Sequence, residues 1–121
     1  MQNVNSLLQS LVNSINSTYE GTTEYLPPYD GTATPGPAAR AAMIAAVKDY
    51  AASCPDVPIV MIGYSFGGIM MMDTLCGGIS SDYNANIIAA IAYGEETRVA
   101  DQSYDTGNCT TSSVSCISKD N

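Results

Sequence analysis

Two continuous apolar runs, residues 57–62 and 87–93, constrain the fold of this chain more than any other feature. Each has the length of a strand, and a strand that is apolar on both sides is typical of a parallel sheet covered on both faces. Helical patterns alternate with them: residues 3–18 form an amphipathic pattern, an alanine-rich segment follows Pro37, and residues 69–75 lie between the two runs. This alternation predicts an α/β domain with a mainly parallel sheet, in one folding unit over residues 1–121.

Glycines and prolines predict where these elements end. Residues 24–26 are expected to form a short strand that Pro27 and Pro28 end, because proline cannot donate to a strand ladder. Residues 30–37 are expected to form a loop. The alanine-rich helix should end near Cys54 and bury one face, composed of Ala39, Met43, Ala46, Val47 and Tyr50.

Charge limits the partners that the chain can bind. Four basic residues face twelve acidic ones, which gives a formal net charge of −8. Such a surface repels nucleic acid and anionic membranes, and no stretch is long enough to span a bilayer. We therefore predict no nucleic-acid and no membrane partner. Neutral polysaccharides and uncharged esters are the kind of substrate that this surface tolerates.

The cysteines favour disulfides over a metal site. Four are present: Cys54, Cys76, Cys109 and Cys116. They form no C-x-x-C pair, and the sequence contains no histidine, so no metal is predicted. Their pairing is left open by the sequence. Disulfides and the glycosylation acceptors Asn16 and Asn108 fit a secreted protein, although the first ten residues do not form a signal peptide.

Residues 63–67 read G-Y-S-F-G, which matches the motif G-x-S-x-G between a predicted strand and a predicted helix. Ser65 should lie on a sharp, strained turn, with Gly63 and Gly67 leaving space around it. The helix after the turn should direct its free N–H groups at the site, and the N–H of Phe66 is the expected oxyanion donor. We predict that Ser65 is the nucleophile of an acyl transfer.

Two other interpretations of this turn remain open. The glycines can simply join a strand to a helix, or their N–H groups can bind a phosphate. A dinucleotide-binding fingerprint is disfavoured, because it requires glycine at the position of Ser65.

The central segment also resembles a known family. Residues 54–55, 59–65, 67–68 and 75–78, together with Asp73, resemble the middle of the cutinase and acetylxylan esterase family in order and spacing. Downstream, residues 89–91 with 94–95, followed by residues 104–109, resemble a strand and a Gly-Thr-Cys loop of that family. Upstream, the first helix and residues 25–27 resemble its second helix–strand unit. The resemblance covers nearly the whole chain.

This resemblance implies a three-layer, small α/β-hydrolase fold with a parallel sheet. The fold is incomplete here, because the family's first strand and its oxyanion loop have no counterpart. It also implies a secreted esterase that uses a Ser-Asp-His triad without metal or cofactor. The implied substrates are the acetyl groups of a polysaccharide such as xylan, or a cutin-like ester, with mild preference for the former. The residue after the nucleophile is usually glutamine in the family, and Phe66 replaces it here.

The resemblance also suggests a triad acid. In the family this aspartate lies four residues after a cysteine, and Cys116 and Asp120 reproduce that spacing. Asp73 is expected to belong to the structural pattern instead. Asp101 and Asp105 are expected to be loop carboxylates.

A triad base is missing from the sequence. Lys48 and Lys119 are poor substitutes for histidine, because neither is expected to be desolvated. The family's histidine follows its acid, so we expect a chain truncated at both ends, in which Cys54 and Cys116 lack their family partners. The predicted function is carboxylic ester hydrolysis that is weak or absent in this chain. The alternatives are a noncatalytic remnant or isoform with a carbohydrate- or ester-binding groove and, less favoured, a phosphate-binding module.

Overall fold

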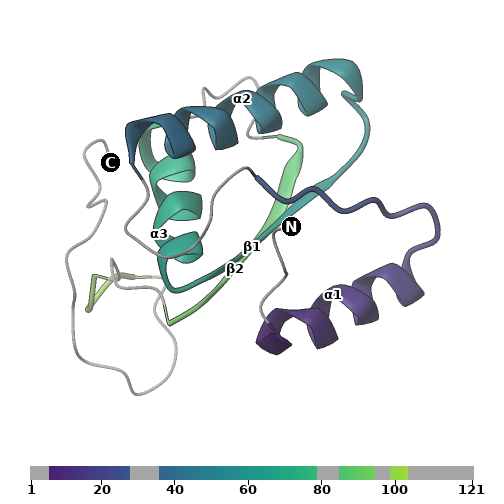
Figure 1. Ribbon diagram of the computed structural model, residues 1–121, viewed down its shortest axis with the longest axis horizontal. Helices are drawn as coiled ribbons and strands as arrows, with labels where there is room; N and C mark the ends of the chain where they lie inside the picture. The colour runs from purple at the N-terminus through teal and green to yellow at the C-terminus, as the bar shows by residue number, and fades with distance from the viewer. Residues whose placement is uncertain (1–5, 28–35, 79–84, 95–98, 104–121) are drawn as a thin grey trace.

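The computed structural model describes residues 6–27, 36–78, 85–94 and 99–103 (Figure 1). The elements in chain order are α1 (Ser6–Thr18), α2 (Pro37–Ser53), β1 (Ile59–Tyr64), α3 (Phe66–Asp73), the π-helical turn η1 (Thr74–Gly78) and β2 (Ile87–Tyr93). Strands β1 and β2 are parallel neighbours. In Figure 1, α2 and α3 lie on one side of the two strands and α1 lies on the other. The predicted alternation of helices with parallel strands is confirmed for these elements.

Helix α1 has the amphipathic character that its sequence predicts. Leu8 is buried, and Leu11, Val12 and Ile15 are half-buried, whereas the asparagine and serine side chains between them face solvent. The described helix begins at Ser6, and residues 1–5 lie outside the described ranges.

Helix α2 begins at Pro37, as predicted, and ends at Ser53, directly before Cys54. Its buried face differs from the predicted one. Val47 and Ala51 are buried and Met43 is half-buried, so the contact row follows a spacing of four residues. Tyr50 is exposed, which corrects the prediction. Tyr50 lies about 60° around the helix from Val47 and about 100° from Ala51, at the edge of this row.

Strand β1 is shifted by two residues from the predicted run 57–62. Pro58, which precedes the strand, has no N–H to donate to a ladder. At its other end the strand continues through Gly63 and Tyr64, because these residues pair with Ala92 and Tyr93 of β2. Strand β2 has the predicted bounds.

The core lies between the strands and the two helices on their side. Val47 of α2, Met61 of β1 and Met71 of α3 form its buried centre. Around this centre pack partly buried hydrophobic side chains: Met43, Ile59, Met72, Leu75 and Ile87. Methionine fills gaps between elements of different geometry because its side chain is unbranched and flexible. No aromatic side chain belongs to this cluster.

The predicted strand at residues 24–26 is wrong. Residues 22–27 have no regular secondary structure, and the side chains of Tyr25 and Leu26 are exposed. A strand is stable only when neighbouring strands or a packed face hold it. Within the described ranges, β1 and β2 pair with each other and not with this segment. The loop predicted at 30–37 falls mostly outside the described residues.

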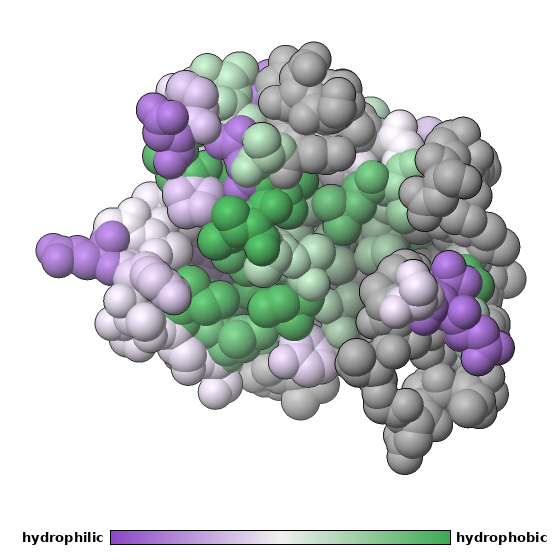
Figure 2. Space-filling model, turned by 180° about the vertical axis from the view of Figure 1, so that it is seen from behind, coloured by the Kyte–Doolittle hydropathy of each residue, from purple (hydrophilic) through white to green (hydrophobic). Residues whose placement is uncertain are grey.

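Apolar side chains are also found on the surface. Figure 2 shows hydrophobic residues gathered at the centre of one face of the molecule. Val60 of β1 and Ile88 of β2 are among the exposed large hydrophobic residues, so the strands are not covered on both faces by the described elements. None of the described helices has the length and apolarity needed to cross a bilayer.

The side chain of Asn86 connects the segment before β1 to the start of β2. Its amide nitrogen donates to the carbonyl oxygens of Pro55 at 2.8 Å, Val57 at 3.2 Å and Cys54 at 3.4 Å. Its own backbone carbonyl accepts the N–H of Ile59 at 2.7 Å. One residue therefore sets the alignment of the two strands at their beginning.

We predict that Asn86→Asp lowers the free energy of unfolding by about 1–3 kcal/mol, because a carboxylate cannot donate to three carbonyl oxygens. Asn13→Asp is the matched control, since Asn13 is exposed on α1 and its side-chain oxygen only accepts a bond from Gln9. Urea denaturation at neutral pH measures both changes. Equal, small effects of the two substitutions would show that the Asn86 contacts do not stabilise the fold.

Candidate active site

Ser65 occupies a strained turn between β1 and α3. Its backbone angles are φ 50° and ψ −121°, in a region that residues with a side chain rarely adopt. Tyr64 is the last residue of β1, and Phe66 is the first of α3. The sequence predicts a sharp strand-to-helix turn at this position, and the structure confirms it.

Hydrogen bonds on both sides hold the backbone of Ser65. Its N–H donates to the carbonyl of Tyr93 at 2.9 Å, which extends the β1–β2 ladder by one residue. Its carbonyl accepts the N–H of Gly68 at 2.8 Å and that of Ile69 at 3.2 Å, which forms the first turn of α3. The sequence predicted that this helix begins at residue 69. These bonds explain why α3 begins earlier, at Phe66. Strain persists at such a residue only where its surroundings determine the conformation.

The side chain of Ser65 takes no part in capping the helix. Serine at this position usually accepts a bond from a backbone N–H of the first turn, but Ser65 makes no side-chain capping bond. The residue is half-buried, as is Phe66 after it. The N–H of Phe66 is the first amide of α3, and the first amides of a helix have no acceptor within the helix. The turn thus combines a hydroxyl that the helix does not use with an amide at the positive end of a helix.

Gly63 permits the close approach of β1 to α3. A Cβ atom at this position would lie 2.7 Å from the carbonyl oxygen of Gly67 and 2.7 Å from the Cα and N atoms of Gly68. No side chain fits there. The steric role predicted for Gly63 agrees with this geometry, and the one predicted for Gly67 stays a prediction. A Cβ at Gly67 meets nothing within 4 Å among the described residues.

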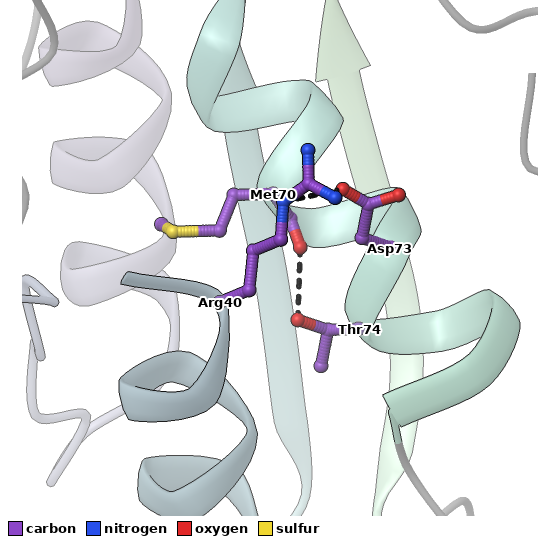
Figure 3. Close-up of polar contacts among 4 residues, drawn as sticks. All are labelled: Arg40, Met70, Asp73 and Thr74. Atoms are coloured by element: carbon purple, nitrogen blue, oxygen red, sulfur yellow. Dashed lines mark hydrogen bonds and ion pairs between the residues drawn. The ribbon is translucent and has the colours of Figure 1, made fainter. Parts of the chain in front are cut away.

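The far end of α3 widens into the π-helical turn η1. Thr74 is fully buried, and its hydroxyl donates to the carbonyl of Met70 at 2.8 Å (Figure 3). Its backbone N–H is shared between the carbonyls of Met70 and Met71. These bonds satisfy the buried hydroxyl and the carbonyls at the end of the helix. The turn ends at Gly78, where the sequence predicts the helix to stop.

Asp73 joins α3 to α2. Its Oδ2 atom lies 3.1 Å from Nε of Arg40 (Figure 3), in an ion pair without the alignment of a hydrogen bond. The arginine side chain is 40% exposed, and such pairs contribute about 0–1 kcal/mol. Asp73 is the last of the eight residues of α3, about 10 Å along the helix axis from Phe66 at its start. It is too far from Ser65 to orient a base there, which agrees with its predicted structural role.

The other ionisable candidates in the described ranges form no hydrogen bond with Ser65. Asp101 is exposed, and Lys48 is half-buried on α2. Within the described ranges no carboxylate or amine hydrogen-bonds to Ser65, and no group of three or more potential metal ligands occurs. Asp105, Lys119 and the candidate acid Asp120 lie outside the described residues, as do Cys109 and Cys116.

One feature of the site was missed by the sequence analysis. Tyr93 supplies the carbonyl that holds the Ser65 amide, and its side chain is in register with that of Tyr64. Both tyrosines stand at the ends of their strands. The sequence contains one signal for this pairing: Tyr64 stands just after the first apolar run, and Tyr93 ends the second.

A strained serine between a parallel strand and a helix is the arrangement that α/β hydrolases use for their nucleophile. A family model described as Cutinase matches residues 2–121. The chain therefore belongs to the cutinase family. The structure is similar to a solved acetylxylan esterase, with a TM-score of 0.74 and 29% identity over 86% of this chain and 62% of that one. This likeness confirms the predicted α/β-hydrolase fold class.

Curated relatives with similar sequences are also acetylxylan esterases and a cutinase. The chain is 35% identical to acetylxylan esterase 2 of Talaromyces purpureogenus over 57% of its own length and 35% of the relative's. It is 30% identical to an acetylxylan esterase of Hypocrea jecorina over 58% of its length and 28% of the relative's. It is 32% identical to cutinase 11 of Verticillium dahliae over 57% of its length and 28% of the relative's. The matches thus span about a third of these curated relatives.

Substitution by alanine should affect the stability of the protein differently at the two glycines of the turn. We predict that Gly63→Ala lowers the free energy of unfolding by at least about 1–3 kcal/mol, because the new methyl group would overlap backbone atoms that cannot move independently. Gly67→Ala should be neutral or stabilising by about 0.5–1 kcal/mol, because alanine favours a helix more than glycine does. Thermal and urea denaturation of the three proteins compares them. A harmless Gly63→Ala would contradict the close approach of β1 and α3.

Proposed function

We propose that this chain is a carboxylic ester hydrolase domain, a single unit over residues 1–121, that acts by acyl transfer through Ser65. The observation that carries the proposal is the strained backbone of Ser65, whose hydroxyl is not used to cap α3. The Oγ of Ser65 would attack the ester carbonyl carbon, and the alcohol would leave with the serine proton. Water would then cleave the acyl-serine and release the acid. The N–H of Phe66 would stabilise the oxyanion of each tetrahedral intermediate.

The proposed substrate is an ester of the plant cell wall, either an acetyl group on a polysaccharide or a cutin-like ester. The relatives named acetylxylan esterase and cutinase support this class. The net charge of −8 is compatible with a neutral substrate. We further propose a secreted protein that contains disulfides. The disulfide-bonded state of Cys76 supports this, while Cys54 is a free thiol.

Proton removal from Ser65 limits the proposed reaction. The 121 residues contain no histidine, and a serine hydroxyl is a weak nucleophile without a neighbouring base. Asp120 is proposed as the triad acid on its spacing from Cys116 alone. An acid without a base cannot activate the serine. We therefore propose that these 121 residues hydrolyse esters slowly.

A noncatalytic role is the second candidate function, and the missing histidine favours it. Such a protein would keep a carbohydrate- or ester-binding surface and lose turnover. The two candidates differ in whether Ser65 reacts covalently with an ester or an ester-like inhibitor.

We predict that the 121-residue protein hydrolyses an activated acetate ester at most marginally faster than its Ser65→Ala variant. In a serine protease, loss of a triad member leaves about 10³- to 10⁴-fold catalysis over water. The residual rate enhancement should be smaller here, because Phe66 N–H is the one oxyanion donor identified. Product release from 4-nitrophenyl acetate at neutral pH measures both proteins.

Covalent labelling completes the experiment. A fluorophosphonate should add its mass slowly to the wild-type chain and not to Ser65→Ala, with Ser53→Ala as a matched control that still reacts, since Ser53 is an exposed serine at the end of α2. Fast hydrolysis that depends on Ser65 would mean that a base is present and that the activity is not weak. Labelling that is identical in wild type and Ser65→Ala would remove the nucleophile assignment.

A further inference from the structure

Two tyrosines lie side by side at the ends of the parallel strands. Tyr64 is the last residue of β1 and Tyr93 the last of β2, and the strand register pairs them directly. Adjacent strands are about 4.8 Å apart, so the two residues are immediate neighbours. Tyr64 is 37% exposed and Tyr93 is 49% exposed. Neither belongs to the buried core between the strands and helices.

Both tyrosines adjoin the proposed nucleophile. Tyr64 directly precedes Ser65, and the carbonyl of Tyr93 accepts the Ser65 N–H at 2.9 Å. The ring of Tyr64 extends toward the end of β2, because its Cε2 atom would lie 3.8 Å from a Cβ placed on Gly94. Gly94, which directly follows the end of β2, has no side chain that would contact the ring. Because Tyr64 is bonded to Ser65 and Tyr93 accepts its backbone N–H, a ligand whose ester carbonyl reaches Ser65 would lie near this pair.

The chemistry of the pair favours one kind of ligand. A tyrosine ring offers a flat apolar face with an electron-rich centre, and its hydroxyl can donate and accept hydrogen bonds. A pyranose ring is complementary to such a surface, because it has C–H groups on its faces and hydroxyls at its edge. The chain contains no tryptophan, so tyrosines are its largest flat side chains. The net charge of −8 disfavours an anionic polymer and leaves a neutral one unaffected.

We propose that Tyr64 and Tyr93 form a stacking platform for the sugar rings of a neutral polysaccharide, beside Ser65. The platform would hold the carbohydrate part of the substrate so that an ester on the sugar reaches the serine hydroxyl. This inference rests on the proposed ester-hydrolase function for its position, and it specifies the substrate as a carbohydrate ester. A fatty, cutin-like acyl chain is the competing occupant of the same surface.

Binding of unacetylated xylohexaose tests the platform without any chemistry at Ser65. Isothermal titration calorimetry should show saturable binding by the wild-type chain, and Ser65→Ala should bind equally. Tyr93→Ala and Tyr64→Ala should each weaken binding about tenfold, the change expected when one aromatic anchor is lost. Tyr93→Phe should retain most of the affinity, because the ring face remains. Tyr19→Ala is the matched control, since Tyr19 is 66% exposed and lies after α1.

Several results would overturn the inference. These are no saturable binding by the wild-type chain, equal weakening by Tyr19→Ala, or unchanged binding after removal of both rings. Preference for long-chain over acetyl 4-nitrophenyl esters that is lost in Tyr93→Ala and kept in Tyr93→Phe, without sugar binding, would assign the pair to an acyl chain instead. Urea denaturation identifies any variant that is unfolded, and Tyr64→Ala tests the platform where Tyr93→Ala does not fold. Loss of xylohexaose binding leaves Ser65-dependent labelling unchanged, so the two proposals fail separately.

Discussion

The close contact between Gly63 of β1 and the first turn of α3 is the constraint on which the site depends. The backbone of Gly67 and Gly68 occupies the volume that a side chain at residue 63 would need. This contact leaves one residue, Ser65, to reverse the chain from strand to helix, and a reversal in so short a distance requires its positive φ. The strained serine is thus a consequence of how tightly the helix packs on the strand.

The energy of that strain is offset by regular structure on both sides. The Ser65 amide continues the β1–β2 ladder through Tyr93, and its carbonyl begins α3. The core centred on Met61 and Met71 fixes the same strand against the same helix. At the opposite end of the strands, the three bonds from the Asn86 amide set their alignment. The turn is therefore supported by the strands and the helix on both sides of it, which is a common basis for a precise site.

The sequence predicted the elements that follow from local pattern. The bounds of β2, the start of α2 at Pro37 and the turn at Ser65 depend on apolar runs and on proline and glycine chemistry, which neighbours do not alter. The failures depend on contacts between distant segments. Residues 24–26 have no partner strand among the described elements, and Tyr50 lies at the edge of the row that faces the core. The pairing of Tyr64 with Tyr93 requires the strand register, which no local pattern contains.

The hydrogen bond from the Ser65 amide to Tyr93 has a consequence for the dynamics of the site. This proton is shielded from solvent only while the last residues of β1 and β2 remain paired, whereas amides such as that of Met61 lie deeper in the ladder. Fraying of the strand ends would expose the Ser65 amide to deuterium exchange well before the core opens. The same fraying would release the serine backbone from its strained geometry. The exchange rate of one backbone proton would therefore measure how much of the time the turn is assembled.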